Sequence, residues 1–175
     1  MDILEYLKND HDKVRNLLTR LVSEPINKDL FIEFQEELML HNKVEEQIFY
    51  KELQERAGNL DIIADASKKE HSLVEDIINY INTNKFEPQE CKVLIPILKA
   101  TIEAHILKEE ENIFSLAKNI ISEEERNMLG KKFAEEKERN VGNVKPHIRT
   151  EANTDHINNY IRAATQTKVF VQEDA

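Results

Sequence analysis

Hydrophobic residues recur every three or four positions along most of this chain, which is the spacing of helices that bury one face. The pattern and its end signals predict five helices, over 2–23, 29–57, 60–84, 88–119 and 122–140. Pro25 stops the first helix, and Asp29 is expected to cap the second. Pro88 takes the first position of the fourth helix, where proline is favoured. The chain is therefore predicted to be mostly helical.

The connections between the first four predicted helices are short, roughly three to six residues, and such connections make consecutive helices antiparallel neighbours. We therefore expect an all-α fold. It consists of an up-down-up-down four-helix bundle over residues 1–120, followed by an extra C-terminal helix and a tail over residues 121–175. Pro96 is expected to kink the fourth helix, and Ser122 and Glu125 to form a capping box at the start of the fifth.

Composition and charge narrow the class of protein. The chain has 175 residues, which is room for one domain, and only 3 Gly and 4 Pro, too few for the turns of an all-β or α/β fold. Its longest apolar run, residues 93–98, is far too short to span a membrane. The net charge of −10 argues against nucleic acid or an anionic membrane as a partner. The single Cys91 excludes an internal disulfide, and the N-terminus lacks a signal-peptide pattern, so a cytoplasmic location is expected.

Each of the first four predicted helices carries a histidine within its apolar stripe, and two of them carry a glutamate as well. These inward-facing residues are His11, His41, Glu45, His71, His105 and Glu109. An ionised glutamate in a dry core is costly unless a cation meets it, and no Lys or Arg occupies the adjacent stripe positions. A metal ion would resolve this conflict, because neutral imidazole and carboxylate are both good ligands.

An internal repeat makes this pattern more specific. A lone His-x-x-x-Glu is weak evidence in a chain rich in acidic residues, and it occurs four times, at 41–45, 71–75, 105–109 and 147–151. Residues 41–50 and 105–114, however, correspond at a constant offset of 64, with HNKVEEQIFY matching HILKEEENIF. The preceding helices carry Asp10-His11 and Glu70-His71. Two half-sites related by a pseudo-twofold axis are therefore predicted.

Helix lengths place the candidate ligands at a common depth. His11 lies about 12 residues before the end of the first predicted helix and His41 about 12 residues after the start of the second, so both are roughly 18 Å from the turn between them. Across the second turn, Glu45 and His71 agree within one or two residues. His105 differs by about one helical turn, which a bend in the fourth helix can absorb. The side chains are expected to meet in one layer.

The joint pattern resembles the hemerythrin-like HHE cation-binding family over about residues 3–118. The resemblance rests on a histidine in the first and third helices and on His-x-x-x-Glu in the second and fourth, with the flanking Glu-Glu and Ile-Phe residues that are typical of the family. It implies a non-haem di-iron centre, oxo- or hydroxo-bridged, in which Glu45 and Glu109 bridge two iron ions and the histidines cap them. It also implies that the protein binds or reacts with a small ligand such as dioxygen, nitric oxide or peroxide, because sites of this family bind dioxygen reversibly, respond to nitric oxide or peroxide, or sense iron.

One departure from hemerythrin itself concerns Glu75, because hemerythrin has His-x-x-x-His on the helix where this chain has His71 and Glu75. Four histidines, two bridging carboxylates and a bridging oxygen fill about ten of the roughly twelve positions around two octahedral ions. Glu75, water or a diatomic ligand would take the other two, which makes Glu75 a seventh candidate ligand. The alternative is a solvated glutamate. A carboxylate-rich site favours oxidation over reversible oxygen carriage.

Three other functions remain as alternatives. A non-redox metal-binding or iron-sensing interaction module, holding zinc or manganese, would use the same types of ligand. A ferritin- or rubrerythrin-type enzyme is disfavoured, because no histidine has a glutamate three residues before it. A metal-free bundle with hydrogen-bonded core histidines is disfavoured by the two inward glutamates.

The residues around the candidate ligands are not expected to bind the metal. Asp10 and Glu70 are expected to face water, and Glu46 and Glu110 to lie beside the site or in solvent. Tyr50 is expected to pack in the core with its hydroxyl hydrogen-bonded. Three further residues are not expected to take part in metal chemistry, namely Cys91, which is expected to be half-buried and inert, and the tail residues His147 and His156.

Overall fold

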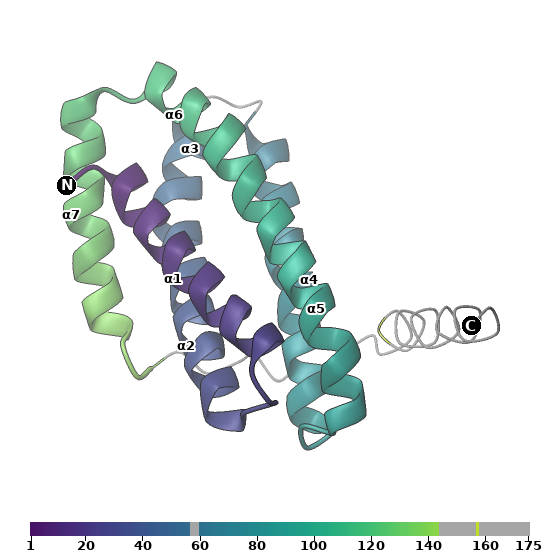
Figure 1. The fold of residues 1–175 in the computed structure, drawn as a ribbon. Coiled ribbons are helices and arrows are strands. Elements are labelled where there is room, and N and C mark those ends of the chain that lie inside the picture. Colours follow the sequence, from purple (N-terminus) through teal and green to yellow (C-terminus); the bar gives the residue numbers. More distant parts are fainter. Residues whose placement is uncertain (57–59, 144–156, 158–175) are drawn as a thin grey trace.

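The computed structural model describes residues 1–56, 60–143 and 157. This part of the chain is helical and contains no strand, so the predicted all-α class is confirmed there. The long helices are α1 (Ile3–Ser23), α2 (Lys28–Glu45), α4 (Asp61–Thr83), α5 (Pro88–Lys108) and α7 (Glu123–Asn140). Two short helices, α3 (Lys51–Arg56) and α6 (Phe114–Ile120), extend the segments begun by α2 and α5. Figure 1 shows the long helices side by side in a bundle, with α7 against α1 at one edge.

The ends of the helices follow from local side-chain chemistry. Asp2 caps α1 through its side chain, and the predicted capping box of Ser122 and Glu125 opens α7. The prediction that Asp29 caps the second helix is wrong. The cap is Asn27, whose Oδ1 accepts a hydrogen bond from the amide of Asp29 at 2.9 Å, so the helix starts earlier than expected.

Two π-helical turns interrupt segments that the sequence predicts as continuous α-helix. The first, Glu46–Tyr50, begins directly after the candidate bridging residue Glu45, and the second, Glu109–Ile113, begins at the other one, Glu109. A π turn contains one more residue than an α turn, so the position five residues after each glutamate shares its face instead of the position four residues after it. Pro96 lies inside α5, which continues through it, and a kink there stays a prediction.

The buried apolar residues form two clusters. One combines the second half of α1 and the first half of α2 with the later part of α4 and most of α5, together with Ile157. The other combines the start of α1 with α3, α6 and α7 and the residues that flank them. His11, His71 and Glu109 fall between residues of the two clusters along the chain, and His41, Glu45 and His105 lie close to the change from one cluster to the other. A polar layer therefore crosses the bundle and divides its core.

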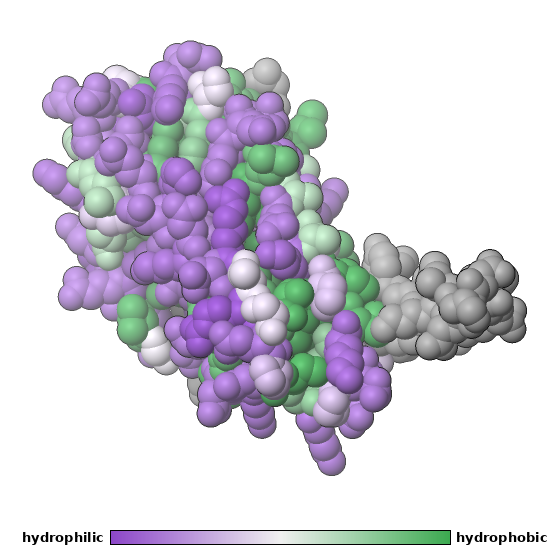
Figure 2. Space-filling view, in the orientation of Figure 1, coloured by the Kyte–Doolittle hydropathy of each residue, from purple (hydrophilic) through white to green (hydrophobic). Residues whose placement is uncertain are grey.

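Hydrophilic residues cover most of the face shown in Figure 2, with smaller hydrophobic areas between them. The mean hydropathy of −0.59 agrees with this surface. In the ranges that the structure describes, no helix combines the length and the apolar character needed to cross a membrane.

Candidate metal centre

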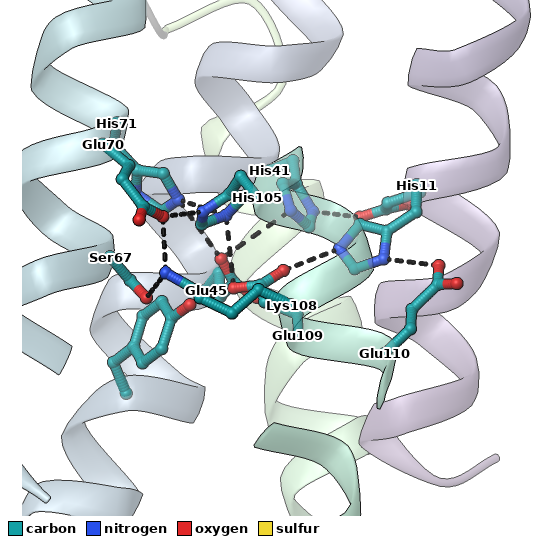
Figure 3. Close-up of polar contacts among 12 residues, drawn as sticks. His11, His41, Glu45, Ser67, Glu70, His71, His105, Lys108, Glu109 and Glu110 are labelled. Atoms are coloured by element: carbon teal, nitrogen blue, oxygen red, sulfur yellow. Dashed lines mark hydrogen bonds and ion pairs between the residues drawn. The ribbon is translucent and has the colours of Figure 1, made fainter. Parts of the chain in front are cut away.

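Six of the seven candidate ligands meet in the polar layer, where they project from four different helical segments toward one another (Figure 3). They form two groups, one of His11, His41, Glu45 and Glu109, and one of Glu45, His71, His105 and Glu109. Within each group, one ligand atom from every residue lies within 4.8 Å of the others, and all the residues are buried. Both glutamates belong to both groups, so two ions, if each group held one, would share two carboxylates.

Glu109 lies between one histidine of each group. Its Oε2 is 3.1 Å from Nε2 of His11, and its Oε1 is 3.2 Å from Nε2 of His105. The side chain of Glu109 is fully buried. The two oxygens of this carboxylate therefore point to different ion positions, which is the arrangement that a bridging ligand needs.

Glu45 lies opposite, between the other two histidines. Its Oε2 is 3.7 Å from Nε2 of His41 and 3.6 Å from Nε2 of His71. Glu45 is 0% exposed, and neither of its oxygens accepts a hydrogen bond. Nε2 of His71 also lies 3.1 Å from Nε2 of His105, so two ring nitrogens face each other. Buried acceptors without donors are costly, and a cation held between these groups would satisfy them.

Each histidine places its other ring nitrogen, Nδ1, against a carboxylate on the outer side of the layer. The pairs are His11 with Glu110 (3.0 Å), His41 with Asp10 (3.4 Å), His71 with Glu46 (2.7 Å) and His105 with Glu70 (2.7 Å). An ionised carboxylate can only accept a hydrogen bond, so Nδ1 donates. In a neutral imidazole, Nε2 then keeps its lone pair directed into the layer, as a metal ligand requires.

The prediction that Asp10 faces water is wrong, and Glu70, which is also predicted to face water, does so only in part. Asp10 is 4% exposed, and its Oδ2 lies 2.8 Å from Nζ of Lys137 in α7. Glu70 is half-buried, and its Oε2 lies 2.5 Å from Nζ of Lys108. The position next to a ligand does point about 100° away on its own helix. In a bundle, however, that direction is covered by the neighbouring helix, so these carboxylates reach the histidine of the adjacent helix.

The central carboxylates hold protons unequally in the protein without metal. Burial raises the pKa of Glu45 well above its ordinary value, and the nearby Glu109 carboxylate raises it further. Burial also acts to raise the pKa of Glu109, but its contacts with His105 and His11 lower it well below the ordinary value. Burial acts to lower the pKa of His105, but Glu109 and Glu70 raise it to about 9. Without a bound cation, burial beside Glu109 therefore favours the protonated form of Glu45, whereas the contacts with His105 and His11 favour the ionised form of Glu109.

Tyr50 and Phe114 flank the site at corresponding positions of the sequence repeat, Tyr50 at the end of the first π-helical turn and Phe114 directly after the second. Tyr50 is fully buried, as expected, and its hydroxyl donates a hydrogen bond to Oε1 of Glu109. Burial raises the pKa of this phenol far above its ordinary value, so the hydroxyl stays protonated. Phe114 stacks on His11 with ring centroids 5.9 Å apart and an angle of 14° between the planes. The sequence predicts neither Glu109 as the partner of Tyr50 nor the stacking of Phe114 on His11, although the position five residues after each glutamate is a signal for both contacts.

The remaining candidates lie apart from the two groups. Glu75 is half-buried on α4, one turn after His71, and is a member of neither group, so its role as a ligand stays a prediction. Cys91 is fully buried instead of half-buried, and burial raises the pKa of its thiol to about 11. His147 and His156 lie outside the described residues.

Comparison with known protein families matches residues 2–117 to the hemerythrin HHE cation binding domain. The match covers about two thirds of the chain and contains all six residues of the two buried groups. No curated protein and no solved structure matches the chain at a significant level. Because the family match spans most of the chain and the family's cation-binding residue types converge in the structure, the chain belongs to the hemerythrin HHE cation-binding domain family.

Proposed function

We propose that this protein holds a non-haem di-iron centre that binds or reacts with dioxygen or a related small oxidant, such as nitric oxide or peroxide. The observation that carries the proposal is Glu45, a fully buried carboxylate whose two oxygens accept no hydrogen bond. Keeping such a group without a partner costs free energy, which a bound cation would recover. The two groups that share both glutamates support two ions instead of one.

Each residue of the layer has a definite role in this proposal. Glu45 and Glu109 join the two ion positions, and each position has two histidines of its own. The outer carboxylates hold the imidazole rings in the tautomer that points Nε2 inward. Iron, when bound, supplies the capacity to exchange electrons with a small oxidant at an open coordination position. The protein contributes the ligands, their orientation and the exclusion of bulk water.

A small cavity beside the histidines supports the proposal that the ligand is a small molecule. Its wall contains the four histidines and, among others, Val14, Leu38, Val74, Ile102 and Ile106. The space inside, about 10 Å³, is room for roughly one molecule of the size of water. A mostly apolar wall favours an uncharged molecule over an ion, and a space this small is better suited to a very small ligand than to an organic substrate.

We also propose that the four helices carrying the candidate ligands form an up-down-up-down bundle. α1 packs on α2 and α5, and α4 packs on α5, which supports an up-down-up-down order for α1, α2, α4 and α5. The division into a bundle over 1–120 and an additional helix and tail over 121–175 stays a prediction. The cytoplasmic location also stays a prediction.

Metal analysis of protein purified without chelator, followed by anaerobic reconstitution with Fe(II), tests the proposal. We expect two iron ions per chain and, after exposure to air, the optical spectrum of a ferric di-iron site. A stable single zinc ion with no uptake of iron would contradict the proposal and would favour a non-redox metal-binding module instead.

A further inference from the structure

Helix α7 lies outside the residues matched by the family, yet it is seated closely on the bundle (Figure 1). A Cβ atom at Gly130 would lie 2.3 Å from the carbonyl oxygen of Met1, so glycine permits a close approach of α7 to the start of α1. Nε of Arg126 lies 2.7 Å from Oδ2 of Asp2, and Phe133 is fully buried. These contacts fix the register of α7 along α1.

This register brings Lys137 to the metal centre. Nζ of Lys137 lies 2.8 Å from Oδ2 of Asp10, and the same oxygen lies 3.4 Å from Nδ1 of His41. Lys137 and Asp10 are both largely buried, with side chains 16% and 6% exposed. Two successive contacts therefore connect α7 to a candidate ligand of the ion position of His11 and His41. Lys137 also pairs with Glu37 of α2 at 3.0 Å, and this second contact leads away from the site.

The other half of the repeat contains the same kind of connection, but it is built differently. There Nζ of Lys108 lies 2.5 Å from Oε2 of Glu70, and this oxygen lies 2.7 Å from Nδ1 of His105. Lys108 belongs to α5, the helix that also carries His105. The half-site of His71 and His105 thus has its lysine within the family domain, whereas the half-site of His11 and His41 obtains its lysine from α7.

We infer that Lys137 is a positioning residue of the metal centre, and that it couples the seating of α7 to ion binding at His11 and His41. The inference rests on the proposed function. Lys137 balances the charge of Asp10 and holds this carboxylate against His41, so the imidazole ring stays oriented toward the ion. Because coupling between two sites is reciprocal, bound metal also stabilises α7 on α1. A displacement of α7 would loosen one ion and leave the other in place.

The first experiment compares Fe(II) binding to full-length variants under anaerobic conditions, with a competing chelator. We expect Lys137→Met to lower the affinity for one of the two Fe(II) ions by about tenfold and to leave the affinity for the other unchanged. Glu37→Gln is the matched control, since it removes the negative charge of the other partner of Lys137 and leaves the contacts of Lys137 with Asp10 and of Asp10 with His41. This control should bind both ions within about twofold of wild type, and Lys137→Arg should restore most of the loss, because it keeps the charge.

The second experiment measures hydrogen exchange along α7 with and without Fe(II), a readout that a merely structural contact would not move. Metal should increase the protection of α7 amides in wild type and in Glu37→Gln, and it should not do so in Lys137→Met. The inference would be overturned if Lys137→Met bound both ions as tightly as wild type, or if metal did not change the exchange of α7 in wild type. Either result would leave the proposed function standing. Wild-type protein that takes up no iron would overturn the proposed function, and the inference with it.

Discussion

The hydroxyl of Tyr50 donates a hydrogen bond to Glu109, whereas Phe114, which occupies the corresponding position of the repeat, stacks on His11 and has no hydroxyl to donate. Both residues come five positions after a glutamate of the layer, Tyr50 as the last residue of a π-helical turn and Phe114 as the residue that follows one. The two halves are therefore alike in their ligands and different in this contact. The ion position of His11 lies beside a phenyl ring, and the other position lies beside a phenol.

We expect Tyr50→Phe to lower the free energy of unfolding of the metal-free protein by about 1–3 kcal/mol, because the buried, ionised Glu109 loses a donor. Urea denaturation of protein treated with chelator measures this loss. Tyr6→Phe is the control, because it keeps the ring that packs on Phe133. It should change stability by less than about 0.5 kcal/mol. An equal loss in both variants would mean that the hydrogen bond to Glu109 contributes nothing.

The shared glutamates should be more important for metal binding than their neighbours. Glu45→Ala and Glu109→Ala are each expected to abolish binding of both ions, since each carboxylate lies between the two positions. Glu46→Ala removes the hydrogen bond to Nδ1 of His71, so it should weaken binding about ten- to hundredfold and leave the stoichiometry unchanged at saturation. Metal analysis after equilibrium dialysis distinguishes these outcomes. A loss at Glu46 as complete as that at Glu45 would contradict the assignment.

The prediction that Glu75 is a seventh ligand can be tested through the rate of oxidation. Its negative charge, close to His71 on the same helix, would stabilise ferric over ferrous iron. The reduced protein is therefore expected to oxidise quickly in air without reversible oxygen binding, and Glu75→His to slow this oxidation. Stopped-flow absorbance of the anaerobically reduced protein, mixed with oxygen, follows the rate. An unchanged rate in Glu75→His would place Glu75 outside the ligand set.

A chain that ends at Asn140 should keep both iron ions, because it retains the two buried groups and Lys137. It should nevertheless be less stable. Ile157, which is 1% exposed in the first apolar cluster, is lost, and burial of one such side chain contributes about 1.5–3 kcal/mol. Metal content and thermal unfolding of the shortened and full chains measure the two effects separately. Loss of iron on truncation would show that a tail residue reaches the site.

Cys91 should be unreactive while the protein is folded. Its thiol is fully buried, and its pKa, raised to about 11 by burial and by the nearby Glu90 and Glu87, keeps it protonated at neutral pH, whereas alkylation requires the thiolate. Iodoacetamide at pH 7, followed by mass spectrometry, should leave Cys91 unmodified in the native state and modify it in urea. Rapid labelling of the native protein would contradict the burial of α5 at this residue.

The sequence predicts most helix ends and the meeting of the six residues of the two groups, but it does not predict most contacts that the remaining side chains make between helices. The capping box of Ser122 and Glu125 and the helix start at Pro88 follow from local chemistry, and the structure has both. The roles of Asp10 and Glu70 depend on an adjacent helix that covers their side. Lys137 lies 127 residues after Asp10 and carries no motif, so no sequence pattern connects the two.

The repeat also bears on how such a centre can be assembled. The first helix pair supplies His11, His41 and Glu45 to its own ion position, and Glu45 and Glu46 reach across to the position of the second pair. The second pair returns the same contribution through Glu109 and Glu110. Each pair supplies three of the four residues of its own group and receives the fourth, a glutamate, from the other pair. Two copies of one such pair, related by a twofold axis, would offer the same side chains to both groups by exchanging glutamates, so joining two copies in one chain would require no new ligand.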